Sequence, residues 1–203
     1  IDLGTGCGVV GLAYLLLKRN ICQGFGMDCN PELIAAAQNN TAKLGFSDRF
    51  ALHTGELADT RFLENLRMEA SPVQLVMANP PWRLVGSGRL PATEARRKAL
   101  FGDKGTFPLF ASAASSLLEE DGRFACIISP DRLQDMLAAL DGAGLTPYLL
   151  QYIHKQKTSP ATFVLIEARK GAHAKPSVAE PIALYGPERF FTLESLAFCP
   201  FLR

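Results

Sequence analysis

The first eleven residues set a strand, a glycine-rich turn and a helix directly after one another, and this order constrains the fold more than any other feature. Ile1-Asp2-Leu3 forms the end of an apolar strand, and glycine then recurs at every second position from Gly4 to Gly8. The apolar residues that follow predict a buried helix: Val9, Val10, Leu12, Ala13, Leu15 and Leu16. Strands and helices also alternate along the rest of the chain, so we expect a mostly parallel sheet with helices on both faces.

The glycine turn also indicates a ligand. Glycines let a ligand approach the backbone closely, and the free N–H groups at a helix start favour a carboxylate or a phosphate. Read as Gly6-x-Gly8-x-x-Gly11, the turn matches the fingerprint of dinucleotide-binding proteins. Read as Asp2-x-Gly4-x-Gly6-x-Gly8, with Thr5 inside it, the turn resembles the cofactor loop of S-adenosylmethionine (SAM) methyltransferases. The turn alone leaves both cofactors open.

Acidic residues follow the next two expected strands. The strand over residues 21–27 ends at Asp28, whose carboxylate can accept from both ribose hydroxyls of an adenosine cofactor. Cys29 is adjacent and is included among the expected contacts. The strand over residues 50–54 is followed by Glu56 and Leu57, which resemble the methyltransferase site for the cofactor's adenine. These acids could instead cap helices or lie in solvated turns.

A rigid turn, Asn79-Pro80-Pro81-Trp82, follows the fourth expected strand. Each proline fixes φ and removes an N–H donor, so the Asn79 amide and the Pro80 carbonyl become stiff acceptors beside the aromatic Trp82. Two acceptors that hold the hydrogens of a planar amino group favour the pyramidal form, whose lone pair can attack a methyl group. The tetrapeptide resembles the N/D-P-P-Y/F/W signature of amino-group methyltransferases. Because a nicotinamide enzyme has no use for this turn, the order of the four motifs favours SAM.

Composition agrees with one globular domain. The chain has 203 residues, of which 48% are hydrophobic and 20% charged. Its five cysteines are odd in number and have no C-x-x-C or Cys/His spacing, so we expect reduced thiols in the cytoplasm and no metal. No apolar run approaches the ~18 residues of a membrane span. The chain begins inside its first strand, so we expect an intact protein to supply the start of that strand and a leader before it.

Two basic segments contrast with a net charge of only +1. Residues 83–104 hold six basic and two acidic residues, and residues 154–175 hold five basic and one acidic, a net +4 in each. We expect them to contact the phosphates of a nucleic acid, although two solvated loops would look the same. The predicted RNA contacts are Arg83, Arg96, Arg97, Lys98, Lys155 and Lys157.

The whole chain is similar to the bacterial tRNA(Val) adenine N6-methyltransferases. The similarity rests on the glycine loop, the Asn-Pro-Pro turn, Ala95-Arg96-Arg97, Gly122-Arg123-Phe124, and a tail with Ile182-Ala183-Leu184-Tyr185 before Phe191-Thr192-Leu193-Glu194. It departs at Trp82, where the family usually has tyrosine. The resemblance implies a Rossmann-like class I methyltransferase fold, a seven-stranded sheet in the order 3-2-1-4-5-7-6 with an antiparallel last strand. We expect a methyltransferase domain over 1–170 and a tail, 171–203, that packs on it.

The expected activity is SAM-dependent methylation of adenine N6 in tRNA by a monomer. Asn79, Pro80, Pro81 and Trp82 would hold the flipped base. Two other methyl acceptors fit the same turn, a release-factor glutamine and guanine N2 in RNA. A SAM-binding module without catalysis that docks on RNA or protein is the alternative of another class.

Overall fold

The computed structural model describes residues 1–18, 23–81, 83–84, 101–171, 175–188 and 190–198. Its main sheet follows the order β10-β8-β9-β7-β4-β1-β2-β3, and β11 also pairs with β8. The strands from the centre to one edge are β1 (Asp2–Leu3), β2 (Gly24–Asp28) and β3 (Phe50–Thr54), and those toward the other edge are β4 (Leu75–Ala78), β7 (Arg123–Ile128), β9 (Ala161–Lys170) and β8 (Leu145–Gln156). The predicted order of the seven main strands is confirmed.

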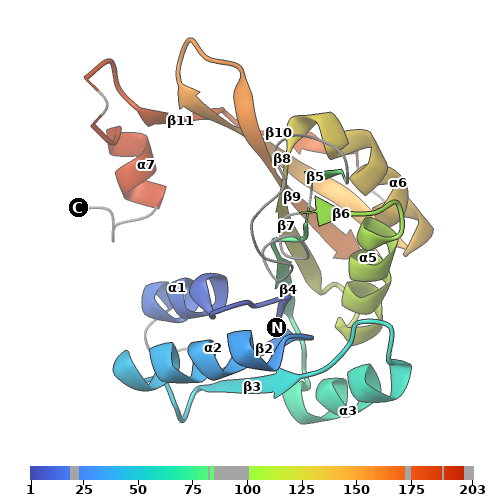
Figure 1. The fold of residues 1–203 in the computed structure, drawn as a ribbon. Coiled ribbons are helices and arrows are strands. Elements are labelled where there is room, and N and C mark those ends of the chain that lie inside the picture. Colours follow the sequence, from blue (N-terminus) through green and yellow to red (C-terminus); the bar gives the residue numbers. More distant parts are fainter. Residues whose placement is uncertain (19–22, 82, 85–100, 172–174, 189, 199–203) are drawn as a thin grey trace.

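Helices cover the sheet in two layers (Figure 1). On one side lie α1 (Val9–Leu17) and α2 (Pro31–Lys43), and on the other lie α3 (Thr60–Ala70), α5 (Thr106–Leu117) and α6 (Leu133–Gly142), the last preceded by a 3-10 turn, η1 (Pro130–Arg132). The core between the sheet and the α5–α6 layer contains the fully buried Phe107, Phe124, Ile128, Met136 and Leu140. No helix in the described part of the chain is both long and apolar enough to cross a membrane.

Local sequence signals explain most helix boundaries. Asn30 caps α2 by accepting from the Glu32 N–H at 2.9 Å, Pro31 opens the helix, and Gly45 with φ +73° follows its end. Asp59 caps α3 in the same way, accepting from the Phe62 N–H at 3.0 Å. Both caps lie at the carboxyl edge of the sheet, where the loops after β2 and β3 therefore have fixed conformations.

The apolar spacing of Phe107, Phe110, Ala114, Leu117 and Leu118 predicts a helix over residues 107–120, but this prediction is wrong at its C-terminal end, because α5 stops at Leu117. Leu118 is extended and fully buried. The Lys170 ammonium, from the end of β9, donates to the carbonyls of Ser115 and Leu118 at 2.9 Å each. A cation on the last carbonyls stabilises a helix end, and this contact between residues more than fifty positions apart is invisible in the local pattern.

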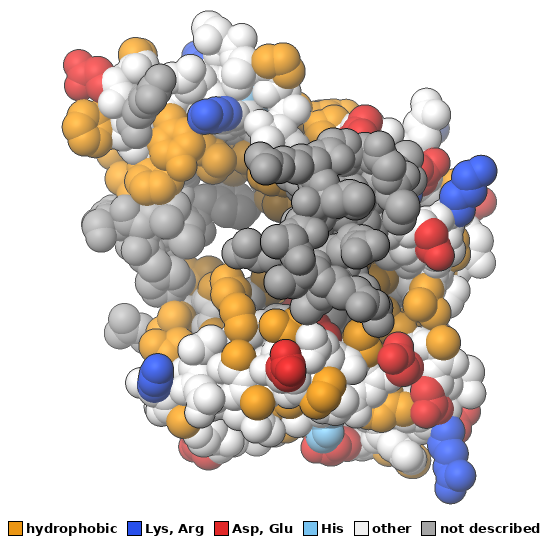
Figure 2. Space-filling model, viewed as in Figure 1, with side chains coloured by type: hydrophobic (Ala, Val, Ile, Leu, Met, Phe, Trp, Pro, Cys, Tyr) orange, Lys and Arg blue, Asp and Glu red, His pale blue; other side chains and the backbone are white. Residues whose placement is uncertain are grey.

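The C-terminal segment adds edge strands to the long β8–β9 hairpin. β10 (Ser177–Val178) and β11 (Ile182–Tyr185) both pair parallel with β8, and α7 (Leu193–Phe198) packs on β11. The sheet therefore has nine strands where seven were expected. Hydrophobic side chains gather over β11 and α7 at the upper left of Figure 2. A separate two-stranded sheet pairs β5 (Arg83–Leu84) with β6 (Phe101–Gly102).

Candidate cofactor and acceptor site

The glycine loop is fixed from beneath by Asp2. One carboxylate oxygen of Asp2 accepts from the Thr5 hydroxyl at 2.7 Å and from the Gly11 N–H at 3.0 Å. Asp2 and Thr5 are both buried, and neither lines a cavity at the carboxyl edge of the sheet. Burial raises the pKa of the Asp2 carboxyl, and the two hydrogen bonds oppose that rise. The two side chains therefore stabilise the conformation of the loop.

The loop is fixed from the side by Asp28. Its two carboxylate oxygens accept from the Gly6 N–H at 3.0 Å and from the Asn30 N–H at 2.9 Å. A carboxylate has about four lone-pair sites, so each oxygen retains capacity for a further donor. Gly6 has φ +56°, and a side chain there would meet no atom within 4 Å, so its surface is open to a ligand. Gly8, with φ +86°, caps α1 instead.

One cavity of about 280 Å³ gathers the predicted cofactor residues from four separate loops. Its predicted lining residues are Gly4, Gly6, Asp28, Cys29, Glu56, Leu57, Asn79 and Pro81. The cavity is also lined by Met27, Asn30, Leu33, Gly55, Leu109 and Phe110. The cavity thus has a carboxylate at the end of β2, an exposed carboxylate after β3 and apolar walls between them.

The Asn-Pro-Pro turn contributes Asn79 and Pro81 to the lining of this cavity. β4 pairs in parallel with β1, with Asp2 opposite Met77 and Leu3 opposite Ala78. The turn after β4 and the glycine loop after β1 therefore leave neighbouring strands at the same edge. Asn79 is exposed, Pro80 is buried, and Pro81 is partly buried. Trp82 lies outside the described residues.

The first turns of α5 form a wall of the cavity that sequence reasoning missed. Leu109 and Phe110 line it, and a side chain on Gly4 would come within 3.3 Å of the Phe110 ring. Any helix residue that faces the core is expected to be apolar, and Phe110 fits that pattern. The sequence therefore gave no sign that Phe110 also contacts the glycine loop.

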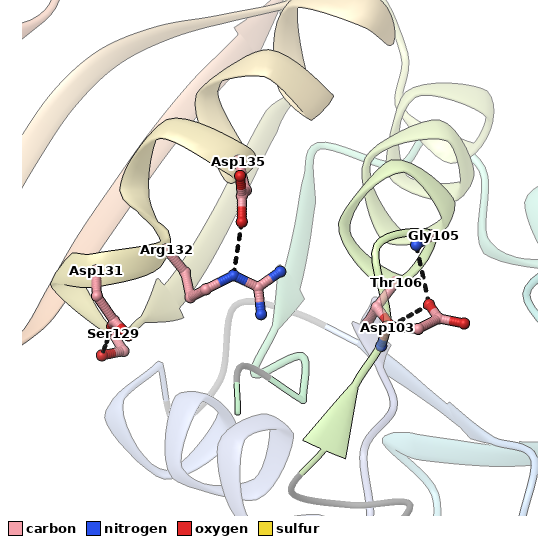
Figure 3. Close-up of polar contacts among 7 residues, drawn as sticks. All are labelled: Asp103, Gly105, Thr106, Ser129, Asp131, Arg132 and Asp135. Atoms are coloured by element: carbon pink, nitrogen blue, oxygen red, sulfur yellow. Dashed lines mark hydrogen bonds and ion pairs between the residues drawn. The ribbon is translucent and has the colours of Figure 1, made fainter. Parts of the chain in front are cut away.

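A buried arginine ends the 3-10 turn η1 before α6. Arg132, only 4% exposed, donates from Nε to Asp135 at 2.7 Å and stacks its guanidinium 4.5 Å from the centre of the Phe107 ring. Its side chain points from the start of α6 toward the first turn of α5, where Asp103, Gly105 and Thr106 form a hydrogen-bonded cluster (Figure 3).

The predicted RNA contacts are only partly covered by the described residues. Lys155 and Lys157 are exposed near the tip of the β8–β9 hairpin. The backbone of Arg83 lies in β5. Arg96, Arg97 and Lys98 lie outside the described residues.

The basic segment 154–175 is not one patch. Arg169 lies opposite Arg123 at the start of β7, whereas the hairpin tip lies beyond the end of that strand. Ala161 to Lys170 spans about 30 Å of strand, so the two ends of the segment lie at opposite edges of the sheet. Arg169 stacks on Tyr148, at 4.6 Å from the ring centre, and Lys170 binds the end of α5. Figure 2 likewise shows Lys and Arg side chains as separate spots on the described part of this face.

Comparisons with known proteins were made for the sequence and for the fold. No family model matches the chain. It is 31% identical over 140 residues to the tRNA1(Val) (adenine(37)-N6)-methyltransferase of Porphyromonas gingivalis, which covers 67% of this chain and 51% of that protein. It is 29% identical over 153 residues to the release factor glutamine methyltransferase of Caulobacter vibrioides, covering 72% of this chain and 50% of that protein. The chain thus spans about half the length of both relatives.

A fold comparison extends the likeness over nearly the whole chain. A predicted O-methyltransferase from Agrobacterium tumefaciens superposes with a TM-score of 0.71 at 20% identity, covering 99% of this chain and 86% of that one. The fold, the predicted strand order and the sequence relatives point the same way, and the predicted resemblance is confirmed. The chain belongs to the class I S-adenosylmethionine-dependent methyltransferases.

Proposed function

We propose that the protein transfers a methyl group from SAM to N6 of an adenine in tRNA. One observation carries the proposal: Asn79 and Pro81 of the acceptor turn line the same cavity as Asp28 and Glu56. The methyl donor and the amino group that receives it would therefore meet within one site. The similarity to an adenine N6-methyltransferase over two thirds of the chain supports adenine as the acceptor.

The residues of the cavity fit SAM along its length. Gly6, with its open surface, would admit the methionine end. Asp28 would accept from the ribose hydroxyls with the lone pairs that Gly6 and Asn30 leave available. Glu56 would accept from the adenine amino group, and the apolar side chains of Leu33 and Leu57 would cover the adenine faces. When bound, SAM supplies a methyl group already activated by its sulfonium.

The acceptor turn would hold and orient the target amino group. The Asn79 side-chain oxygen and the Pro80 carbonyl would accept its two hydrogens, and Trp82 would stack on the flipped base. No general base is needed to start the reaction, because the amino group attacks as a neutral nucleophile and gives its proton to solvent afterwards. Most of the acceleration would come from alignment of the nitrogen with the methyl group.

The tRNA would contact basic side chains beyond the cavity. Lys155 and Lys157 are exposed on the hairpin, and Arg83, Arg96, Arg97 and Lys98 follow the acceptor turn in the sequence. These six residues are our proposed phosphate contacts. We also propose that residues 171–203 complete the methyltransferase unit, which acts as a monomer in the cytoplasm.

The test is methyl transfer to total tRNA from a strain that lacks this gene, followed by nucleoside mass spectrometry. The proposal expects N6-methyladenosine. N2-methylguanosine would shift the acceptor to guanine, and SAM binding with no transfer to any acceptor would favour a non-catalytic docking module.

A release-factor glutamine is the second candidate acceptor, because the other relative with a similar identity methylates that side chain. A side-chain amide offers a planar NH₂ group to the same two acceptors. Parallel reactions with purified release factor and with tRNA separate the two substrates, and labelled protein with unlabelled tRNA would overturn the adenine assignment.

A further inference from the structure

We propose that Gly102 is a positioning residue for the acceptor turn, a role that rests on the function proposed above. Gly102 ends β6 and lies three residues before Gly105, the N-cap of α5. The residue is buried. Its lack of a side chain lets the Pro81 carbonyl pack directly against the chain, which fixes the height of the Asn79 and Pro80 acceptors above the cavity.

The packing around Gly102 leaves no room for a methyl group. A Cβ atom there would come within 2.6 Å of the Pro81 carbonyl oxygen and within 2.7 Å of the Thr106 hydroxyl oxygen. Real Cβ atoms essentially never approach other heavy atoms so closely. Since one of the two neighbours is backbone, the acceptor turn itself would have to move.

The other side of Gly102 is held rigidly by a hydrogen-bonded cluster (Figure 3). The Thr106 hydroxyl accepts from the Asp103 N–H at 3.0 Å and donates to the Asp103 carboxylate at 3.1 Å. The same carboxylate oxygen accepts from the Gly105 N–H at 2.9 Å. This cluster fixes the start of α5, so strain at Gly102 would be relieved on the side of Pro81.

The same helix contacts the donor side of the site. Phe110, one turn after Thr106, lies against Gly4 and lines the cavity. The start of α5 thus supports the acceptor turn through Gly102 and the glycine loop through Phe110. Gly102 contacts the acceptor turn and not the glycine loop. Its substitution should therefore displace the acceptor turn and leave SAM binding unchanged.

The first test compares Gly102→Ala with Gly142→Ala. Gly142 is exposed at the end of α6, and a Cβ there would meet no atom within 4 Å, so it controls for the glycine-to-alanine change itself. We expect kcat on the acceptor that the wild type methylates to fall about 100-fold in Gly102→Ala, while the SAM Kd changes less than about twofold. Gly142→Ala should match the wild type in both.

A second pair of variants covers the possibility that Gly102→Ala unfolds. Thr106→Val keeps the shape of the side chain and loses the hydroxyl, whereas Thr106→Ser keeps the hydroxyl. The proposal expects a lower kcat in Thr106→Val and recovery toward the wild-type kcat in Thr106→Ser, with SAM affinity retained in both. Equal kcat values in the valine and serine variants would contradict the role of the cluster.

Fluorescence separates this inference from the proposed function. The only tryptophan of the chain, Trp82, follows Pro81 directly, so its emission reports on the turn without any methyl acceptor. Gly102→Ala should shift its emission or its acrylamide quenching, and Gly142→Ala should not. If the wild type methylated no RNA, the proposed function would be wrong. The emission shift in Gly102→Ala would still test whether Gly102 packs against the acceptor turn. An unchanged spectrum, or an unchanged kcat, in a folded Gly102→Ala variant would overturn the positioning role.

Discussion

Asp28 both stabilises the loops around the cavity and is our proposed contact for the ribose of SAM. Its oxygens accept from the Gly6 N–H in the glycine loop and from the Asn30 N–H at the start of α2, and the residue also lines the cavity. A carboxylate accepts through both of its oxygens, with about four lone-pair sites in all. Asparagine has nearly the same shape but presents an NH₂ group to one of the two N–H donors.

Asp28→Asn should therefore weaken SAM binding and loosen the loop together. We expect a loss of ~1.5–3 kcal/mol in binding free energy, because charge-assisted hydrogen bonds are replaced or lost. Isothermal calorimetry measures the affinity. Asp48→Asn, which changes an exposed carboxylate that does not line the cavity, is the control. Equal affinities in the two variants would remove Asp28 from the cofactor site.

Two described cysteines should react very differently with iodoacetamide at pH 8. Cys29 is exposed and lines the cavity, so S-adenosylhomocysteine should protect it from alkylation. Burial raises the pKa of the Cys126 thiol to about 12, so this thiol stays protonated and unreactive in the folded protein. Peptide mapping by mass spectrometry reads both positions. Labelling of Cys29 that ignores the ligand would place the cofactor elsewhere.

At the scale of elements, helix boundaries that depend on one residue are encoded locally. The caps at Asn30 and Asp59 and the stop at Gly45 are side-chain or backbone preferences of single residues. The antiparallel last strand that the family resemblance implied is β9, which pairs with β7 and β8. The four loops of the site were predicted because parallel strands bring their carboxyl ends to one edge of the sheet.

Contacts between distant elements could not be read from the sequence. The end of α5 depends on Lys170, and the support of the glycine loop by Phe110 depends on how α5 crosses the sheet. Charge counting along the sequence also merged lysines at the hairpin tip with Arg169, because it ignored the length of β9. In each case the deciding neighbour is far away in sequence.

The two lysines at the tip of the β8–β9 hairpin allow a test of whether this hairpin binds RNA. Replacing both Lys155 and Lys157 by alanine should weaken tRNA binding and flatten the plot of log K against log salt by about 0.7–0.9 per lost phosphate contact. Lys18 and Lys43 are exposed at the C-terminal ends of α1 and α2, so Lys18→Ala/Lys43→Ala is a control with the same charge change. Filter-binding titrations over a salt series measure both slopes. Identical slopes in the two double variants would exclude the hairpin from the RNA contact.

For the whole molecule, the strand order of the sheet brings two groups of cavity-lining residues together. β1 and β2 present the glycine loop and Asp28, and β4, paired directly with β1, presents Asn79. The residues that we propose for the methyl donor and for its acceptor therefore lie at the ends of the neighbouring strands β1, β2 and β4. This arrangement predicts that substitutions can separate SAM binding from methyl transfer, since the residues proposed for each follow different strands.

Asn79→Ala tests the central claim most directly, because the Asn79 side chain would hold the acceptor nitrogen. Wild type and variant are incubated with SAM and tRNA that lacks the modification, and the nucleosides are quantified by mass spectrometry beside calorimetric SAM affinities. The account predicts N6-methyladenosine with the wild type, a loss of at least about 100-fold with the variant, and similar SAM affinities. Near-normal N6-methyladenosine from the variant, or none from a wild type that binds SAM, would contradict it.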